Sequence, residues 1–390
     1  MDFELQWLLW ALPLTFALGW LASRLDLRQF RRERNESPKV YYKGLNLLLN
    51  EQHDKAIDVF IEAVQQDPEA SDLHFALGNL FRRRGEYERA VRVHQHLLGR
   101  ADLPRSERDR AQYALAQDFM KAGLFDRAET AYRALAGTAF DTEARLALLD
   151  LHERAREWRS AIDVAVQLEA SGMGSFASRI AHYWCELAIE ADAAHDAATA
   201  EEASGHARAA APRDARPLVL AGERAAARGD HEEALRWWNM LMAIQPAAFN
   251  LVARRYAACA GAAGRAADAI ERLSAMVELA PSMDLLDSIA SLQDEPAARQ
   301  ARLLAHLREH PTLAAADALL AIWVTPDTTP PTTTAPATAI AALRDAVHRA
   351  AKPLHRYRCA ACGFEAEHYF WQCPGCLGWD TYPPRRLEDL

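Results

Sequence analysis

SDLHFALGNLFRRRGEYERAVRVHQHLLGR, residues 71–100, holds the pattern that decides the fold. Its residues are mostly helix formers, and β-branched runs are scarce both here and along the rest of the chain. Gly78 in this stretch lies 34 residues after Gly44, and Ala90 lies 34 residues after Ala56. A repeat of this period predicts a stack of antiparallel helix pairs.

Each unit is expected to pair two helices closely at small residues, with a large residue filling the space to the next pair. A glycine is expected in the turn within each pair, and a proline after the second helix. The turn glycines are Gly85, Gly123, Gly229 and Gly264, and the prolines are Pro68, Pro212, Pro246 and Pro281. The pattern resembles the tetratricopeptide repeat over about 40–281, is degraded around 149–168 and 183–212, and predicts a further pair around 285–311.

Such a solenoid offers an extended concave surface for binding other proteins. In the second and third units, aromatic, amide and cationic side chains are expected to line a partner-binding groove that suits an extended peptide or an acidic tail. The alternative is an ordinary solvated helix face. The groove residues are Phe75, Asn79, Arg82, Arg83, Tyr113, Gln117 and Lys121.

The beginning of the chain indicates a membrane anchor. Residues 5–23 carry no charge, and a helix of this length crosses a hydrocarbon core of about 30 Å. The acidic start, with Asp2 and Glu4, does not fit a cleaved signal peptide. We therefore expect a single transmembrane helix within residues 1–23. Arginines dominate the juxtamembrane segment 24–39, which predicts a periplasmic N-terminus and a cytoplasmic remainder.

The rest of the chain is expected to contain four further parts. The Pro/Thr-rich stretch is typical of an extended linker, and Pro353 is expected to stop the helix that follows it. The expected parts are the solenoid over 40–324, the linker over 325–339, a short helix over 340–353 and a compact four-cysteine module over 354–384.

The module has two cysteine pairs, each with two intervening residues, separated by ten residues. This spacing lets two tight turns direct four thiolates at one ion, and an S4 set of this kind selects zinc or iron. Gly363 and Gly375 are expected to adopt conformations that a side chain would resist and to direct N–H groups at sulfur. The predicted metal ligands are Cys359, Cys362, Cys373 and Cys376.

The sequence Cys373-Pro374-Gly375-Cys376, with aromatic residues around it, resembles the rubredoxin knuckle. The resemblance implies one iron, with zinc as the alternative. A module this small needs its metal to fold, and its surplus of aromatic residues indicates docking on the solenoid. Cys185 and Cys259 have no partner at ligand spacing and are expected to be buried thiols.

Composition excludes several classes of protein. A formal net charge of −9 disfavours a nucleic-acid binder, and six cysteines in 390 residues are too few for a disulfide scaffold. The chain has no Gly-rich phosphate loop, no His-Glu-x-x-His and no Gly-x-Ser-x-Gly sequence. We therefore expect no enzyme, but a mainly α protein with a transmembrane helix, an α-solenoid and a metal module.

The order of these parts resembles the lipopolysaccharide assembly protein B (LapB) family over the full chain. The match rests on residues 1–23, on 42–46 (YKGLN) and on 357–379. The resemblance implies an inner-membrane adaptor that modulates lipopolysaccharide levels by promoting proteolysis of the deacetylase LpxC by the membrane protease FtsH. It also implies coordination of lipopolysaccharide assembly enzymes.

Two alternative functions remain on sequence grounds. The first is a membrane-tethered, rubredoxin-like electron carrier on a helical scaffold. The second, ranked below it, is a zinc-ribbon nucleic-acid binder, whose basic residues beside the cysteines, such as Arg356 and Arg358, are offset by acidic ones. An iron that cycles between oxidation states, and its visible colour, would distinguish this carrier from the adaptor. The sequence leaves self-association open, and it leaves open which repeats contact which partner.

Overall fold

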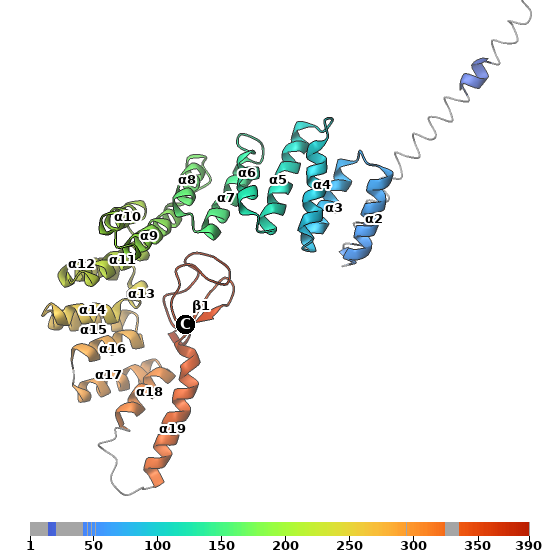
Figure 1. The fold of residues 1–390 in the computed structure, drawn as a ribbon. Coiled ribbons are helices and arrows are strands. Elements are labelled where there is room, and N and C mark those ends of the chain that lie inside the picture. The colour runs from blue at the N-terminus through green and yellow to red at the C-terminus, as the bar shows by residue number, and fades with distance from the viewer. Residues whose placement is uncertain are drawn as a thin grey trace, which may run out of the picture. The chain divides into compact units, whose positions relative to one another are not determined.

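A computed structural model describes residues 15–20, 42–44, 46–47, 49–50, 52–293, 295–323 and 335–389. The described chain folds mainly into antiparallel helix pairs followed by a small module, which confirms a helical-repeat protein with a terminal metal-binding module (Figure 1). It divides into two compact units, Met1–Val164 and Ala165–Leu390.

The first unit consists of helix pairs stacked in chain order. Of the predicted anchor, only residues 15–20 are described, and they are helical; the rest lies outside the described residues. Within the described ranges, no helix is long and apolar enough to cross a membrane. The helices are α2 (His53–Gln66), α3 (Ser71–Arg83), α4 (Tyr87–Gly99), α5 (Arg105–Lys121), α6 (Phe125–Arg133), α7 (Asp141–Ala155) and α8 (Trp158–Ala170), which continues into the second unit.

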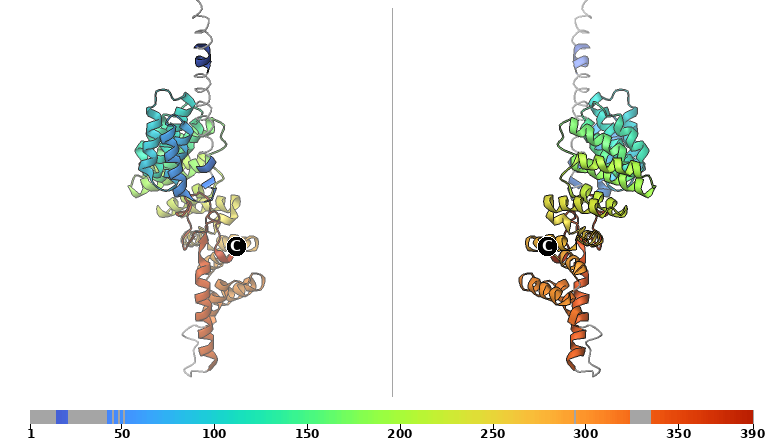
Figure 2. Two further views of the ribbon diagram at one scale, coloured as in Figure 1. Left: turned by 90° about the vertical axis from the view of Figure 1, so that its right-hand side faces the viewer. Right: turned by 90° about the vertical axis from the view of Figure 1, so that its left-hand side faces the viewer.

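The second unit also consists of helix pairs and includes the pair predicted around 285–311, which is confirmed as α16 and α17. Its helices are α9 (Ala177–Ala193), α10 (Ala197–Ala210), α11 (Ala215–Ala227), α12 (His231–Ile244), α13 (Pro246–Phe249), α14 (Ala253–Ala262), α15 (Ala266–Leu279), α16 (Met283–Leu292), α17 (Pro296–Glu309), α18 (Leu313–Trp323) and α19 (Ala335–Ala351). Helix α19 packs against α18. Figure 2 shows α19 as the long orange-red helix in the lower part of both views.

Helix α19 is longer than the sequence predicted. It begins at Ala335, inside the segment expected to be linker, and a proline at its second position suits the first turn of a helix. The linker residues 325–334 lie outside the described residues. After α19 the chain forms η2 (Lys352–His355), the antiparallel strands β1 (Tyr357–Arg358) and β2 (Glu365–Ala366), and η3 (Leu387–Asp389).

Close contact between a glycine and a ring holds helix pairs together. A Cβ on Gly44 would lie 2.6 Å from the ring of Phe60, and a Cβ on Gly222 would overlap the ring of Trp238. Each ring therefore occupies the space left by the missing side chain of a glycine in its own pair. The same rings also lie in buried clusters with apolar residues of the next pair, as predicted: Phe60 with Leu77, and Trp238 with Tyr256.

The predicted turn residues and buried thiols are confirmed. Gly85 has a φ of 79°, a left-handed conformation that favours glycine, and the other three turn glycines share it. Helix α2 ends two residues before Pro68, as the predicted stop requires. Cys185 and Cys259 are buried, and burial raises the pKa of Cys185 to about 12.

Candidate metal centre and its docking on the repeats

Two turns with the same backbone pattern position the four cysteines. In the first turn, the Cys359 N–H donates to the Phe364 carbonyl at 2.9 Å, and the Gly363 N–H donates to the Cys359 carbonyl at 2.9 Å. The second turn repeats both bonds, with Cys373 and Leu377 donating at 2.9 and 2.8 Å. Each turn therefore closes around its own cysteine pair without help from the other.

The two turns place their left-handed residue at the same position, directly after the second cysteine. This residue is Gly363 in the first turn, with φ of 77°, and Leu377 in the second, with φ of 60°. The expectation of a special conformation at Gly375 is therefore wrong. Gly375 supplies space instead, because a Cβ there would lie 3.4 Å from the sulfur of Cys362. As predicted, its N–H points at sulfur, that of Cys373, at 3.4 Å.

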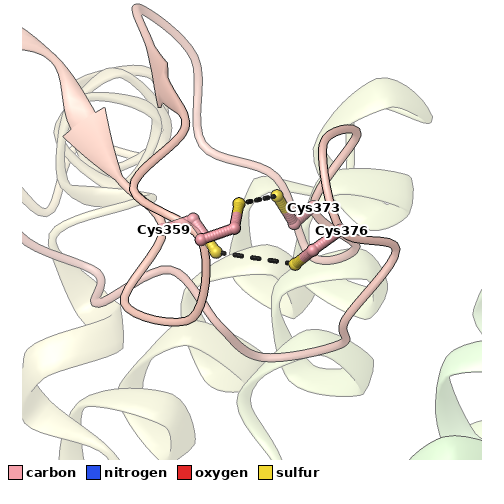
Figure 3. Close-up of side chains that lie close together, drawn as sticks. Cys359, Cys373 and Cys376 are labelled. Carbon is pink, nitrogen blue, oxygen red and sulfur yellow. Dashed lines mark hydrogen bonds between the residues drawn. The ribbon is translucent and has the colours of Figure 1, made fainter. Parts of the chain in front are cut away.

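The turns bring all four sulfurs together. The four Sγ atoms lie within 4.8 Å of one another. The Cys359 and Cys376 sulfurs are 3.8 Å apart, and those of Cys362 and Cys373 are 3.6 Å apart (Figure 3). A tetrahedral ion with metal–sulfur bonds of about 2.3 Å needs sulfurs about 3.8 Å apart. The four cysteines thus form a metal-binding site of rubredoxin or zinc-ribbon type.

Electrostatics within the cluster also call for a cation. Burial disfavours the Cys359 thiolate, but the Thr381 hydroxyl and two backbone N–H groups stabilise it and lower its pKa to about 6. The Phe364 N–H favours the Cys362 thiolate, but burial and the neighbouring sulfurs outweigh it and raise the pKa of Cys362 to about 12. Four thiols this close cannot all become negative unless a positive ion lies among them.

The module docks on the repeats of its own unit, as its aromatic surplus predicted. Asp380 lies 2.7 Å from His182 Nε2 in α9, and the ring of Trp379 stacks on that histidine with centroids 4.7 Å apart. The Arg216 guanidinium of α11 lies over the rings of Trp379 and Trp371, at 5.4 and 5.9 Å from their centroids. Side chains of two successive repeats therefore contact the residues on either side of the second cysteine turn.

The next two repeats hold the rest of the module. Leu251, just before α14, packs against the buried cluster of Tyr357, Cys359, Cys373 and Tyr382. Arg386 donates two hydrogen bonds to the carboxylate of Asp284 in α16, at 2.9 and 3.1 Å, a strong bidentate geometry. Four of the repeat residues that contact the module are here called the docking row: His182, Arg216, Leu251 and Asp284.

The docking row follows the repeat. Its successive members are separated by 34, 35 and 33 residues, so each occupies the same place in its unit. None of these four residues was predicted from the sequence, although their spacing equals the period of the repeat. The repeat position is occupied by four different residue types: a histidine, an arginine, a leucine and an aspartate. They have no property in common, because each contacts a different partner in the module.

The chain beyond Tyr382 belongs to the module as well. The Glu388 carboxylate accepts the Ala314 N–H at the start of α18, at 3.0 and 3.1 Å, where the helix dipole favours an anion. The Leu387 N–H donates to the Arg356 carbonyl at 2.8 Å. The module thus extends to Asp389, beyond the predicted end at residue 384, and reaches a fifth helix pair.

The predicted groove residues of the first unit have unequal exposure. Phe75 is 2% exposed and covered by Arg110, so its prediction as a ligand contact is wrong. Arg82 is half-buried and donates to Asp118 at 2.8 Å and to Asn79 at 2.6 Å. Its guanidinium is therefore occupied by contacts within the protein. The others are Tyr113, stacked on Phe140, half-buried Gln117, and the exposed Arg83 and Lys121.

Comparison with known proteins agrees with both parts of the fold. The family described as rubredoxin metal binding domain matches residues 357–383, and the tetratricopeptide repeat family matches residues 73–109. Lipopolysaccharide assembly protein B of Escherichia coli K12 is 32% identical over 391 residues, covering 99% of this chain and 99% of that protein. The protein of the same name in Haemophilus influenzae is 25% identical over 98% of both chains.

Among solved structures, a tetratricopeptide repeat protein from Parabacteroides merdae aligns with 66% of this chain and 98% of its own. Its sequence identity is 13% and its TM-score is 0.34.

Proposed function

The chain belongs to the lipopolysaccharide assembly protein B family, and from this premise we propose that it is a membrane-anchored adaptor that modulates lipopolysaccharide levels. One observation carries the proposal: the metal site takes all four ligands from cysteine and is docked on the repeats. A site closed by four protein ligands keeps no position for substrate, which supports a structural metal and an adaptor function.

The proposed action is delivery of a client to a protease. The family resemblance points to the deacetylase LpxC as client and the membrane protease FtsH as the enzyme that degrades it. Repeat pairs supply an extended binding surface, and a second function in gathering lipopolysaccharide assembly enzymes would use the same surface. Tethering adaptor and protease to one membrane raises their effective concentration without any new contact.

The membrane tether is part of the proposal. Residues 5–23 are uncharged and long enough to span, and the arginines of 24–39 favour a cytoplasmic position for all that follows. We assign the N-terminus to the periplasm and the repeats to the cytoplasmic side of the inner membrane. Cysteine accessibility to a membrane-impermeant reagent, with single cysteines introduced before and after the segment, tests this orientation.

We assign iron to the four cysteines, on the resemblance to rubredoxin, with zinc as the alternative. A ferric S4 site absorbs visible light and a zinc site does not, so the spectrum of the purified protein with metal analysis decides between them. The second candidate function, electron transfer, is favoured by the exposure of Cys362 and Cys376. It requires iron that is reduced and reoxidised reversibly.

The experiment that tests the adaptor proposal is affinity capture of the detergent-extracted protein. Wild-type protein is expected to retain the protease and the deacetylase, and the Cys359→Ser/Cys362→Ser variant is expected to lose them. Cys259→Ser, a buried thiol outside the metal site, is the matched control. Recovery of neither partner with wild-type protein would refute the proposal, and equal recovery with both variants would refute the metal dependence.

A further inference from the structure

The second unit shows how a ligand lies on this solenoid. The docking row meets the module through side chains on, or just before, the first helix of each pair, at one repeat position. Its contacts include a histidine–aspartate hydrogen bond, stacked rings and a bidentate arginine. The first-helix face is therefore a binding face in this protein, with a protein ligand already in place.

In the first unit the corresponding face carries a repeated positive charge. Arg83 follows the buried Gly78 by five residues, and Lys121 follows the buried Ala116 by five. In the next pair, Arg154 occupies the same place, five residues after the buried Leu149. We call Arg83, Lys121 and Arg154 the cationic row.

The cationic row is free to bind. All three side chains are exposed, and none forms a side-chain hydrogen bond or ion pair with any residue the structure describes. Neighbouring Arg82 differs, since it is fixed by Asp118 at 2.8 Å and by the Ala114 carbonyl at 3.1 Å. That fixed arginine ties α3 to α5 and so holds the first two cations of the row in register.

The second unit lacks this charge. The same repeat position is occupied by Ala193, Ala227 and Ala262 on α9, α11 and α14. A cation on three successive pairs, replaced by alanine on the next three, is a property of one unit and not of the repeat.

We propose that the cationic row binds an acidic, extended segment of a protein partner, which deepens the proposed adaptor function and rests on it. Packed helices lie about 8–10 Å apart, a distance that an extended chain covers in about three residues. A segment with a carboxylate at every third residue would meet one cation per repeat. Asn79 and Gln117 each follow the small residue of their pair by one position and lie beside the row. Their amide groups can form hydrogen bonds with the backbone of the bound segment.

The test is fluorescence anisotropy with full-length protein in mild detergent. The probe is a labelled peptide of four Glu-Ser-Gly units, with a peptide of four Lys-Ser-Gly units beside it. The acidic peptide is expected to bind, the basic one not, and added salt to weaken binding. Arg83→Gln/Lys121→Gln/Arg154→Gln is expected to weaken it about tenfold, since each exposed pair contributes modestly.

The matched control removes the same charge from the second helices of the same three pairs. Arg92→Gln/Arg127→Gln/Arg159→Gln changes three exposed arginines on α4, α6 and α8 and is expected to leave binding unchanged. Equal weakening by both triple variants would reduce the effect to net charge and overturn the proposal. Absence of binding by wild-type protein would overturn it too.

A lipid surface is the competing source of negative charge. Vesicles of equimolar phosphatidylcholine and phosphatidylglycerol are therefore tested with the same variants. Row-dependent vesicle binding without peptide binding would overturn the proposal. Because neither assay contains the protease or the deacetylase, failure here is distinct from failure of the adaptor proposal, which the affinity capture tests separately.

Discussion

The two compact units are built from the same kind of helix pair. They differ in the side chains on the face formed by the first helix of each pair. In the first unit, Arg83 and Lys121 extend into solvent from α3 and α5. In the second unit, His182 and Arg216 hold the metal module, and alanines replace the cations. The buried positions therefore preserve the repeat, while the exposed positions of one face differ between the units. In the second unit they bind the protein's own module, and in the first we propose that they bind a partner.

The same contrast operates inside the core. Trp238 fills the slot beside Gly222 in the second unit, and His94 fills the equivalent slot beside Gly78 in the first. His94 is fully buried, and its Nδ1 lies 2.5 Å from the Asp118 carboxylate, which also accepts from Arg82. The slot of the α3–α4 pair thus links two repeats through a buried polar network, where the slot of the α11–α12 pair holds an aromatic ring.

The largest effect is expected from removing the metal ligands. Cys359→Ser/Cys362→Ser should abolish metal binding and unfold the module, since a structural S4 ion contributes on the order of 10 kcal/mol to a domain this small. Metal analysis and limited proteolysis measure it, with new cleavage expected between residues 357 and 389 and none between 71 and 133. A module that stays protease-resistant without metal would contradict the expectation that its fold depends on the metal.

The next effect concerns the glycine slots of both units. Gly222→Ala and Gly78→Ala should each destabilise the protein by about 1–3 kcal/mol, because the added Cβ would overlap the Trp238 or His94 ring. Urea unfolding followed by circular dichroism measures this. Gly205→Ala in α10, where no atom lies closer than 4.0 Å, is the control and should stabilise by about 1 kcal/mol. Equal behaviour of all three would show that the slots are not close-packed.

Undocking without loss of metal is expected from a smaller change. Arg386→Ala leaves the Asp284 carboxylate, 9% exposed, without its bidentate partner and should weaken docking by about 2 kcal/mol. Hydrogen exchange at the start of α16 measures it, and the metal content should remain unchanged. Arg385→Ala, the exposed neighbour, is the control. Loss of metal in the Arg386 variant would show that docking and metal binding are one event.

The smallest effect is a pH dependence of the tail. Burial, with the charges of Asp284 and Glu388, raises the pKa of Asp389 to about 6 from 3.8. The folded tail therefore keeps a proton that the unfolded tail releases between these values, so stability rises as the pH falls from 6 to 3.8. Partial exposure limits the gain to about 1 kcal/mol.

Hydrogen exchange of residues 383–389 measures this dependence in wild-type protein and in Asp389→Asn. The variant should be better protected than wild type at about pH 7.5, and the difference should vanish near pH 4. A difference independent of pH would show that the carboxyl does not titrate in this window.

Sequence reasoning reached the helix pairs, the turn glycines and the four cysteines because each rests on local spacing. It missed Leu377 as the left-handed residue of the second turn, since leucine rarely adopts that conformation and only the closed turn imposes it. The docking row was not predicted either, because His182 and Asp380 are far apart in the chain and neither residue type indicates contact with the other. Phe75 was misplaced because periodicity alone does not show that Arg110 of the next pair covers it.

The metal module binds the first-helix face of the second unit, so the docked helices should depend on the metal. Hydrogen exchange of the full-length protein before and after metal removal by a chelator tests this dependence most directly. Protection should be lost in residues 357–389 and at the docked helices α9, α11 and α16, and α3 and α5 should be unchanged. Unchanged protection of α9, α11 and α16 in the metal-free protein would contradict it.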